Sequence, residues 1–179
     1  LAGHASLFTG LFPRQAGILD AKCAISRELL TLADFFAELG YRTGAVTDRG
    51  YVSQAFGMDQ GFQFFDERGG TLDETVERTE AFVEADDGRP VFLFVQTYRT
   101  HETYKVSHEA SAALGLAALP TPELKEVKIE YASQQDRARK AELAAELERH
   151  YRATVWDLDR GFERIFRALE ARGTFRNGN

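Results

Sequence analysis

The chain has 179 residues, 44% hydrophobic and 28% charged, which is enough for one sizeable core. Its net charge of −6 and its lack of a basic block argue against nucleic acid as a partner. No apolar run is long enough to span a membrane, and the single cysteine, Cys23, excludes an internal disulfide. These features leave the compartment open, whether cytoplasmic or periplasmic and extracellular.

The first half of the chain alternates helical and extended patterns. Residues 29–40 predict a short amphipathic helix, in which Thr31 and Asp34 form a capping box. Residues 41–47 then predict a strand, and residues 61–66 predict a second, shorter extended segment.

The second half begins with a charged helical pattern at residues 72–85. The unbroken apolar run at residues 91–95 is typical of a strand buried on both faces of a parallel sheet. Residues 105–137 are irregular and are interpreted as an insertion, and residues 138–172 predict a long helix. We expect eight residues to form the buried stripe of this helix: Leu147, Tyr151, Val155, Leu158, Phe162, Ile165, Phe166 and Leu169.

This order of elements predicts an α/β layered domain with a mostly parallel sheet flanked by helices. We expect residues 41–47 and 91–97 to be parallel neighbours or near-neighbours. The helices at residues 32–39 and 147–169 should pack on the faces of that sheet.

The sequence HASLFTGLFP at residues 4–13 resembles the segment that follows the nucleophile in sulfatases of the alkaline phosphatase superfamily. Weaker similarities follow in the order the family has them, at residues 30–46, 56–66, 92–104 and 151–173. Their shared order identifies the chain as a member of this family. The resemblance implies a partial alkaline-phosphatase-like domain. Residues 1–179 would be an internal fragment of it, with residues 105–137 inserted over the active site.

The resemblance implies a metal-dependent hydrolase of sulfate esters, in which a nucleophile attacks sulfur and cations stabilise the oxyanion. The nucleophile would stand immediately before Leu1, and the metal ligands would also lie outside this chain. Among divalent metals the resemblance favours Ca²⁺, with Mg²⁺, Mn²⁺ and Zn²⁺ as alternatives. We therefore expect no metal ligand within residues 1–179, and no hydrolysis of p-nitrophenyl sulfate or phosphate by these residues alone.

Two departures from the family pattern bear on the substrate. Ala2 and His4 stand where the machinery that makes formylglycine requires Pro and Arg, which argues against formylglycine and for an unmodified Ser or Thr nucleophile. Relatives with this pattern include phosphodiesterase-like and phosphonate-hydrolase-like members, so an alternative substrate is a phosphodiester or phosphonate ester. A non-catalytic anion-binding relative is a further alternative. The partner of the catalytic forms would be a small-molecule or glycan ester.

Four residues are candidates for the site. His101 follows the strand at residues 91–95, at the carboxyl end where open α/β sheets place ligands. His4 lies one turn from the expected nucleophile, at a helix start that attracts anions. We assign catalytic roles to these two histidines. Arg49 stands where the family has lysine, and Tyr104 lies in the loop of His101; both are assigned to substrate binding.

Each assignment has a structural alternative. His101 would otherwise be a surface loop residue, and His4 would pack the helix start. Arg49 would be a solvated charge, and Tyr104 would shape the rim of its loop. The other histidines, His108 and His150, and the cysteine, Cys23, are interpreted as structural or solvent-facing residues.

Overall fold

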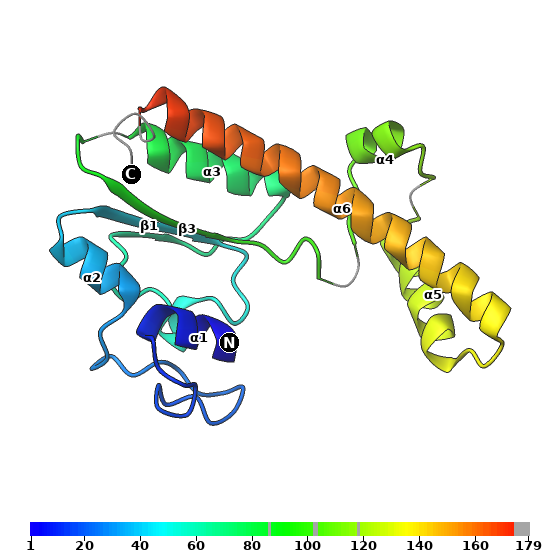
Figure 1. Cartoon of the computed structure of the whole chain (residues 1–179), viewed down its shortest axis with the longest axis horizontal. Helices are drawn as coiled ribbons and strands as arrows, with labels where there is room; N and C mark the ends of the chain where they lie inside the picture. Colours follow the sequence, from blue (N-terminus) through cyan, green and yellow to red (C-terminus); the bar gives the residue numbers. More distant parts are fainter. Residues whose placement is uncertain (86, 102–103, 118, 174–179) are drawn as a thin grey trace. The chain divides into compact units, whose positions relative to one another are not determined.

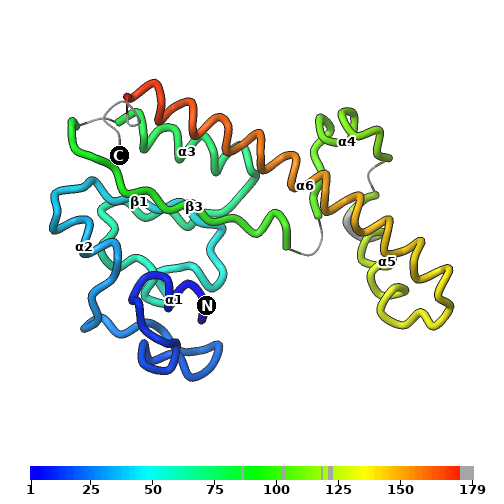
Figure 2. The backbone as a smooth tube through the Cα atoms, viewed as in Figure 1, coloured from blue at the N-terminus to red at the C-terminus, as the bar shows by residue number. Residues whose placement is uncertain are grey.

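The computed structural model describes residues 1–85, 87–101, 104–117 and 119–173 (Figures 1 and 2). The elements are, in chain order, α1 (Ala2–Thr9), α2 (Leu32–Glu38), β1 (Arg42–Thr47), the 3₁₀ helix η1 (Gln54–Phe56), β2 (Phe64–Asp66), α3 (Leu72–Glu84), β3 (Val91–Gln96), α4 (His108–Leu114), α5 (Thr121–Ser133) and α6 (Arg137–Ala171). They form two compact units, a sheet unit (Leu1–Thr97 with Arg164–Asn179) and a helical unit (Tyr98–Glu163). None of the described helices has the length and apolar character needed to cross a membrane.

The three strands form one parallel sheet in the order β2-β1-β3. β1 pairs with β3 from Arg42 opposite Val91 to Thr47 opposite Gln96. On its other edge β1 pairs with β2, with Gly44 opposite Phe64. The predicted α/β class and the predicted parallel pairing of residues 41–47 with 91–97 are therefore confirmed.

The central strand is the polar one. Every residue of β1 is buried, whereas residues 91–95 of β3 are only half-buried. The prediction that the apolar run is the strand buried on both faces is wrong for the described residues. The strand order explains the difference. β1 has a neighbouring strand on each edge, whereas β3 pairs only with β1 among the described strands.

Side chains of β1 find polar partners on the elements around it. The Arg42 guanidinium donates to the carbonyls of Phe82, Val83 and Ala85, which are among the acceptors left without partners at the end of α3. The Thr43 hydroxyl donates to the Gly61 carbonyl at 2.7 Å. These bonds remove the cost of burying polar groups and fix neighbouring segments to the strand.

The helices α2 and α3 each start at a capping box. Thr31 accepts a hydrogen bond from the backbone of Asp34, whose side chain accepts from the backbone of Thr31. Thr71 and Glu74 repeat this arrangement at the start of α3. The box at Thr31 confirms the sequence prediction. It also makes α2 begin at Leu32 rather than at residue 29, because the cap residue itself is extended.

The main core lies between α1 and the sheet. The Phe8 ring of α1 is 4.9 Å from the ring of Phe94 on β3 and 5.7 Å from that of Phe62, both in edge-on geometry. The buried residues of this cluster are Ala5, Phe8, Ala16, Ile18, Ile25, Val52 and Met58. This packing fixes α1, and with it the first motif of the sequence, on one face of the sheet.

The predicted buried stripe of α6 is wrong at four positions. These side chains are between 40% and 58% exposed: Tyr151, Val155, Phe162 and Phe166. The buried face includes Ile165, as predicted, together with Leu143, His150, Ala153 and Thr154. In the helical unit this face is set by hydrogen bonds, because His150 accepts from the Leu119 backbone and Asp157 accepts from Ser107.

The C-terminal part of α6, which belongs to the sheet unit, was expected to pack on a face of the sheet but does not. Arg164 pairs with Glu80 at 2.7 Å and with Asp73 at 3.2 Å, and both acids belong to α3. α3 covers the sheet, with Phe82 lying over Gly44 of β1. Residues 164–171 thus pack on α3 rather than directly on the sheet (Figure 1).

Gly61 packs closely against the start of α2, and Gly10, which also has a positive φ, allows a matched test of that packing. Gly61 has φ +78°, and a Cβ there would lie 2.1 Å from the Asp34 backbone nitrogen. Gly10 has φ +69°, and nothing lies within 4 Å of its Cβ position. Gly10→Ala should cost about 1 kcal/mol of unfolding free energy from left-handed backbone alone. Gly61→Ala should cost more than about 3 kcal/mol, because the clash is with backbone. Urea unfolding measures both, and equal losses would contradict the close packing of Gly61.

Candidate active site at the carboxyl edge of the sheet

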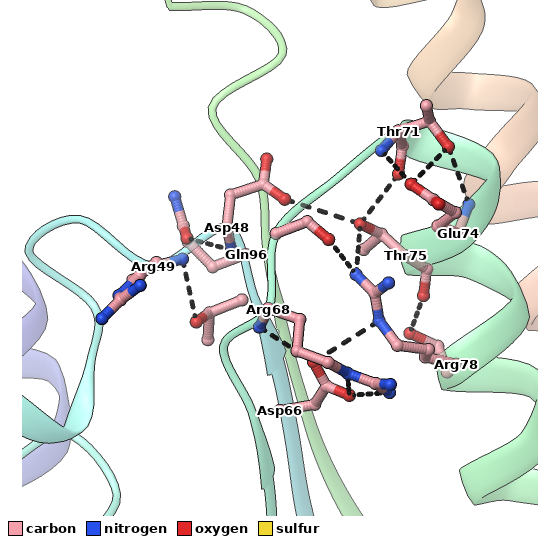
Figure 3. A network of polar contacts seen from close by, with 12 residues as sticks. Asp48, Arg49, Asp66, Arg68, Thr71, Glu74, Thr75, Arg78 and Gln96 are labelled. Atoms are coloured by element: carbon pink, nitrogen blue, oxygen red, sulfur yellow. Dashed lines mark hydrogen bonds and ion pairs between the residues drawn. The ribbon is translucent and has the colours of Figure 1, made fainter.

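Because the strands are parallel, their carboxyl ends meet at one edge of the sheet, and polar residues gather there (Figure 3). They are Asp48 and Arg49 after β1, Asp66 and Arg68 at the end of β2, Gln96 and Thr97 at the end of β3, and Thr71, Thr75 and Arg78 on the adjoining start of α3. Open α/β sheets bind ligands at this edge.

Asp48 connects three elements of the edge. Its backbone N–H lies 3.2 Å from the Gln96 carbonyl oxygen and 3.3 Å from Gln96 Oε1. Its carboxylate accepts a 2.7 Å hydrogen bond from the Thr97 hydroxyl and lies 3.5 Å from the Thr75 hydroxyl. The carboxylate is thereby held in one orientation between β1, β3 and α3.

Arg49 lies on a turn that the sheet holds in place. The Thr47 hydroxyl donates to the Val52 carbonyl at 2.8 Å, and the Arg49 backbone lies 3.3 Å from the same hydroxyl. Arg49 has φ +66°, a left-handed conformation that costs a non-glycine residue about 1 kcal/mol or more. Its guanidinium is 72% exposed and 3.9 Å from Glu67. The turn therefore presents the Arg49 side chain at this edge, and its role in binding an anion stays a prediction.

Asp66 is the most enclosed charge at this edge. Burial by itself raises the pKa of Asp66, but hydrogen bonds from Arg68 and the charge of Arg78 outweigh that effect and hold the pKa below its usual value. Arg68 donates to Asp66 through Nε at 2.8 Å and also through Nη2, and Arg78 Nε lies 3.4 Å away. Asp66 therefore remains a carboxylate at neutral pH.

His4 lies in the first turn of α1, half-buried against the sheet. Its ring is 6.0 Å from the ring of Phe94, in edge-on geometry. Phe94 stands two residues before the end of β3, so His4 lies towards the edge that also carries Arg49. Burial lowers the pKa of His4, which favours the neutral imidazole at pH 7. A neutral ring can accept a proton or orient a neighbouring hydroxyl.

His101 and Tyr104 belong to the helical unit. The His101 backbone N–H donates to the Tyr98 carbonyl at 2.8 Å, and its exposed ring lies edge-on to the Tyr98 ring at 5.8 Å. The half-buried Tyr104 ring contacts Tyr151 at 5.7 Å. That these two residues join His4 and Arg49 in one site stays a prediction.

The other two histidines differ from each other. His150 is fully buried, with Nδ1 2.9 Å from the Glu146 carbonyl and Nε2 accepting a 2.9 Å bond from the Leu119 backbone. Nε2 thereby holds the segment before α5, while Nδ1 is engaged within α6 itself. His108 is exposed at the start of α4. Neither observation assigns them a place in catalysis.

Within the part of the chain that the structure describes, no three His, Cys, Asp or Glu side chains come close enough together to hold a metal ion. The carboxylates at the edge are instead engaged with hydroxyls and arginines. The described residues therefore do not fit a metal site.

Sequence reasoning missed Asp48, Asp66, Gln96 and Thr97. A usable signal was present, because Asp48 and Thr97 directly follow the two strands predicted to pair. Asp66 is the last residue of β2, which has only three residues. So short a pattern does not predict how the strand aligns with its neighbour.

Comparison with known proteins identifies the family. A family model described as "Sulfatase" matches residues 3–178, so the chain belongs to the sulfatase family, as the first motif predicted. No curated protein matches the chain. Its fold is similar to that of BT4656, solved in complex with its substrate D-glucosamine-2-N,6-O-disulfate, with a TM-score of 0.73 and 13% sequence identity. The match covers 97% of this chain and 53% of that one, so the chain spans about half the length of this relative.

The linked charges around Asp66 predict a pH-dependent stability. The folded-state pKa of Asp66 lies below its unfolded value, so its stabilisation is complete above the unfolded pKa and is lost as pH falls through the folded one. Asp66→Asn should lower the unfolding free energy by about 1–2 kcal/mol at pH 7. The difference from wild type should shrink below about pH 4.

Glu148→Gln is the matched control, since Glu148 also pairs with an arginine, Arg152, but is exposed to solvent. Denaturant unfolding at several pH values should show a much smaller effect for this variant. A pH-independent loss in Asp66→Asn would contradict the assignment.

Proposed function

We propose that this chain is part of a hydrolase of sulfate esters. The observation that carries the proposal is the sulfatase-family match across residues 3–178. A parallel sheet whose carboxyl edge gathers charged and hydroxyl groups beside the first turn of α1 supports it. The proposal puts the nucleophile and the metal ligands outside residues 1–179, as the sequence resemblance implies.

The roles of the four candidate residues follow from their chemistry. Neutral His4 would orient the nucleophile or the leaving oxygen. Arg49 offers a planar fork that suits the oxygens of a tetrahedral group. His101 would donate to the charge that develops on the transferred group, and Tyr104 would contact the substrate. The proposal includes a divalent metal, Ca²⁺ by preference, which residues outside 1–179 would hold and which would supply additional positive charge.

The substrate is proposed as a small-molecule or glycan sulfate ester. BT4656 was solved with its substrate D-glucosamine-2-N,6-O-disulfate, which favours a sulfated sugar here. Ala2 and His4 depart from the formylglycine pattern, so the proposed nucleophile is an unmodified Ser or Thr. For the same reason a phosphodiester or phosphonate ester is the second candidate substrate.

His101 provides the sharpest mutational test. In the whole enzyme His101→Ala should lower kcat/KM for p-nitrophenyl sulfate about a hundredfold, the usual effect of losing one donor to a developing oxyanion. His108→Ala is the control, because His108 is an exposed histidine of the same unit. Initial rates and a circular dichroism spectrum of each variant separate loss of chemistry from loss of fold.

Equal rates in the two variants would remove His101 from the site. Binding of inorganic sulfate without hydrolysis of any ester by the wild-type enzyme would favour the non-catalytic anion-binding relative instead.

A further inference from the structure

The buried histidine of the helical unit is a titratable group that the proposed hydrolase chemistry does not use. His150 lies on α6, and 0% of its side chain is exposed to solvent. Its ring has a partner at each nitrogen, Glu146 of the same helix at Nδ1 and the Leu119 backbone at Nε2. Histidine ordinarily changes its charge between about pH 5 and 8, so this ring couples pH to a contact between two segments of the chain.

The two partners determine which nitrogen of the ring carries the proton. A backbone N–H can only donate, so Nε2, which lies 2.9 Å from the Leu119 nitrogen, is an unprotonated acceptor. Nδ1 faces two acceptors, the Glu146 carbonyl oxygen at 2.9 Å and Glu146 Oε1 at 3.2 Å. The single proton of the ring therefore lies on Nδ1. The closed arrangement, in which Leu119 is bonded to His150, requires a neutral ring.

A second proton would have to enter at Nε2. Two N–H groups would then face each other at the Leu119 contact, and a buried donor without an acceptor costs free energy. Nε2 can donate to water only if Leu119 moves away. On the other side of the ring, the Glu146 carboxylate becomes the partner of an imidazolium, which favours the charged form. Protonation therefore breaks the contact with Leu119 and keeps the contact within α6.

Glu146 is the acid that acts on this ring. Among the described residues it is the one acid within 4.0 Å of His150, and its carboxylate also pairs with the exposed Arg149. Leu119 meets the ring through its backbone nitrogen. Charged and titratable side chains on the two preceding helices are exposed to solvent: His108 and Glu109 on α4, and Glu123, Lys125, Glu126 and Lys128 on α5. The charge of the ring is thus set by its burial, by Glu146 and by the Leu119 bond.

The segment that follows Leu119 has little buried surface of its own. Of the side chains described in α5, only Leu124 is buried. The far end of α5 is joined to the start of α6 by a partly exposed ion pair, with Glu130 2.7 Å from Arg139. The Leu119 bond to His150 holds the opposite end of the same helix pair. Loss of that bond therefore releases the end of α5 that lies away from its connection to α6.

We propose that His150 is a pH-sensitive clasp that holds the start of α5 on α6. With a neutral ring the clasp is closed, and Leu119 donates to Nε2. With a protonated ring the clasp is open: the imidazolium pairs with Glu146, Leu119 is released, and the start of α5 moves away from α6. This device responds to mild acid and does not depend on the proposed hydrolase activity.

Amide hydrogen exchange of the 179-residue chain tests the clasp at Leu119. If the ring takes its second proton only in the open arrangement, opening becomes about tenfold more favourable for each pH unit below the ordinary histidine pKa of about 6.5. The protection factor of the Leu119 amide should therefore fall at least about tenfold from about pH 7.5 to about pH 5.5. Nitrogen chemical shifts of the His150 ring should show a proton on Nδ1 alone in the closed form and on both nitrogens in the open form. Amides of the sheet unit should keep their protection.

Variants then assign the effect to this ring. His150→Gln is the conservative variant, because its amide oxygen can accept from Leu119 but does not titrate, so Leu119 should stay protected at both pH values. His150→Leu removes the acceptor and should leave Leu119 unprotected at both. Glu146→Gln removes the partner of the imidazolium and should move the loss of protection to lower pH. His108→Gln is the control, an exposed histidine of the same unit, and should behave as the wild type. Amide spectra establish that each variant is folded.

Three results would overturn the proposal. One is a wild-type Leu119 amide whose protection factor does not change over this pH range. Another is a loss of protection in His150→Gln as large as in the wild type, because the acid-sensitive group would then lie elsewhere. A His150 ring that carries protons on both nitrogens while Leu119 stays protected would contradict it as well.

Discussion

The burial of β1 is the constraint on which the rest of the sheet unit depends. This strand is polar, yet all six of its residues are buried, and burying a polar group costs free energy unless it finds a partner. Each polar side chain of the strand donates to a backbone carbonyl. Arg42 donates at the end of α3, Thr43 donates to Gly61 and Thr47 donates to Val52. Each bond fixes a different neighbour, and Gly44 leaves the space that Phe82 of α3 occupies. The strand thus organises a helix, a glycine turn and the loop at the edge together.

The same constraint shapes the candidate active site. Because Thr47 is tied to Val52, the chain must turn immediately after β1, and Arg49 takes up a left-handed conformation on that turn. The parallel order brings the end of β3 alongside, where Thr97 holds the Asp48 carboxylate. α1 packs through Phe8 on the strand that carries Phe94, which sets His4 near this edge. The contacts around β1 therefore position both the sheet and the candidate active site.

Sequence patterns predicted the features that depend on residues close together in the chain or on the order of helices and strands. The capping box at Thr31 and Asp34 and the parallel pairing of residues 41–47 with 91–97 follow from residues close in sequence or from helix–strand alternation. Burial depends on strand order, so the apolar run of β3 was wrongly predicted to be buried on both faces. The stripe of α6 failed because His150 and Asp157 bind a distant segment, which periodicity does not encode. The Asp48 and Asp66 contacts depend on register between elements in the same way.

The chain belongs to the sulfatase family, and we propose that the enzyme of which it is part hydrolyses sulfate esters. Its most direct test compares kcat/KM of the whole enzyme for p-nitrophenyl sulfate, p-nitrophenyl phosphate and bis-p-nitrophenyl phosphate under one set of conditions. The account predicts the highest value for the sulfate ester. A higher value for either phosphate ester would contradict it and would assign the site to phosphoryl chemistry, in line with the departures from the family pattern at Ala2 and His4.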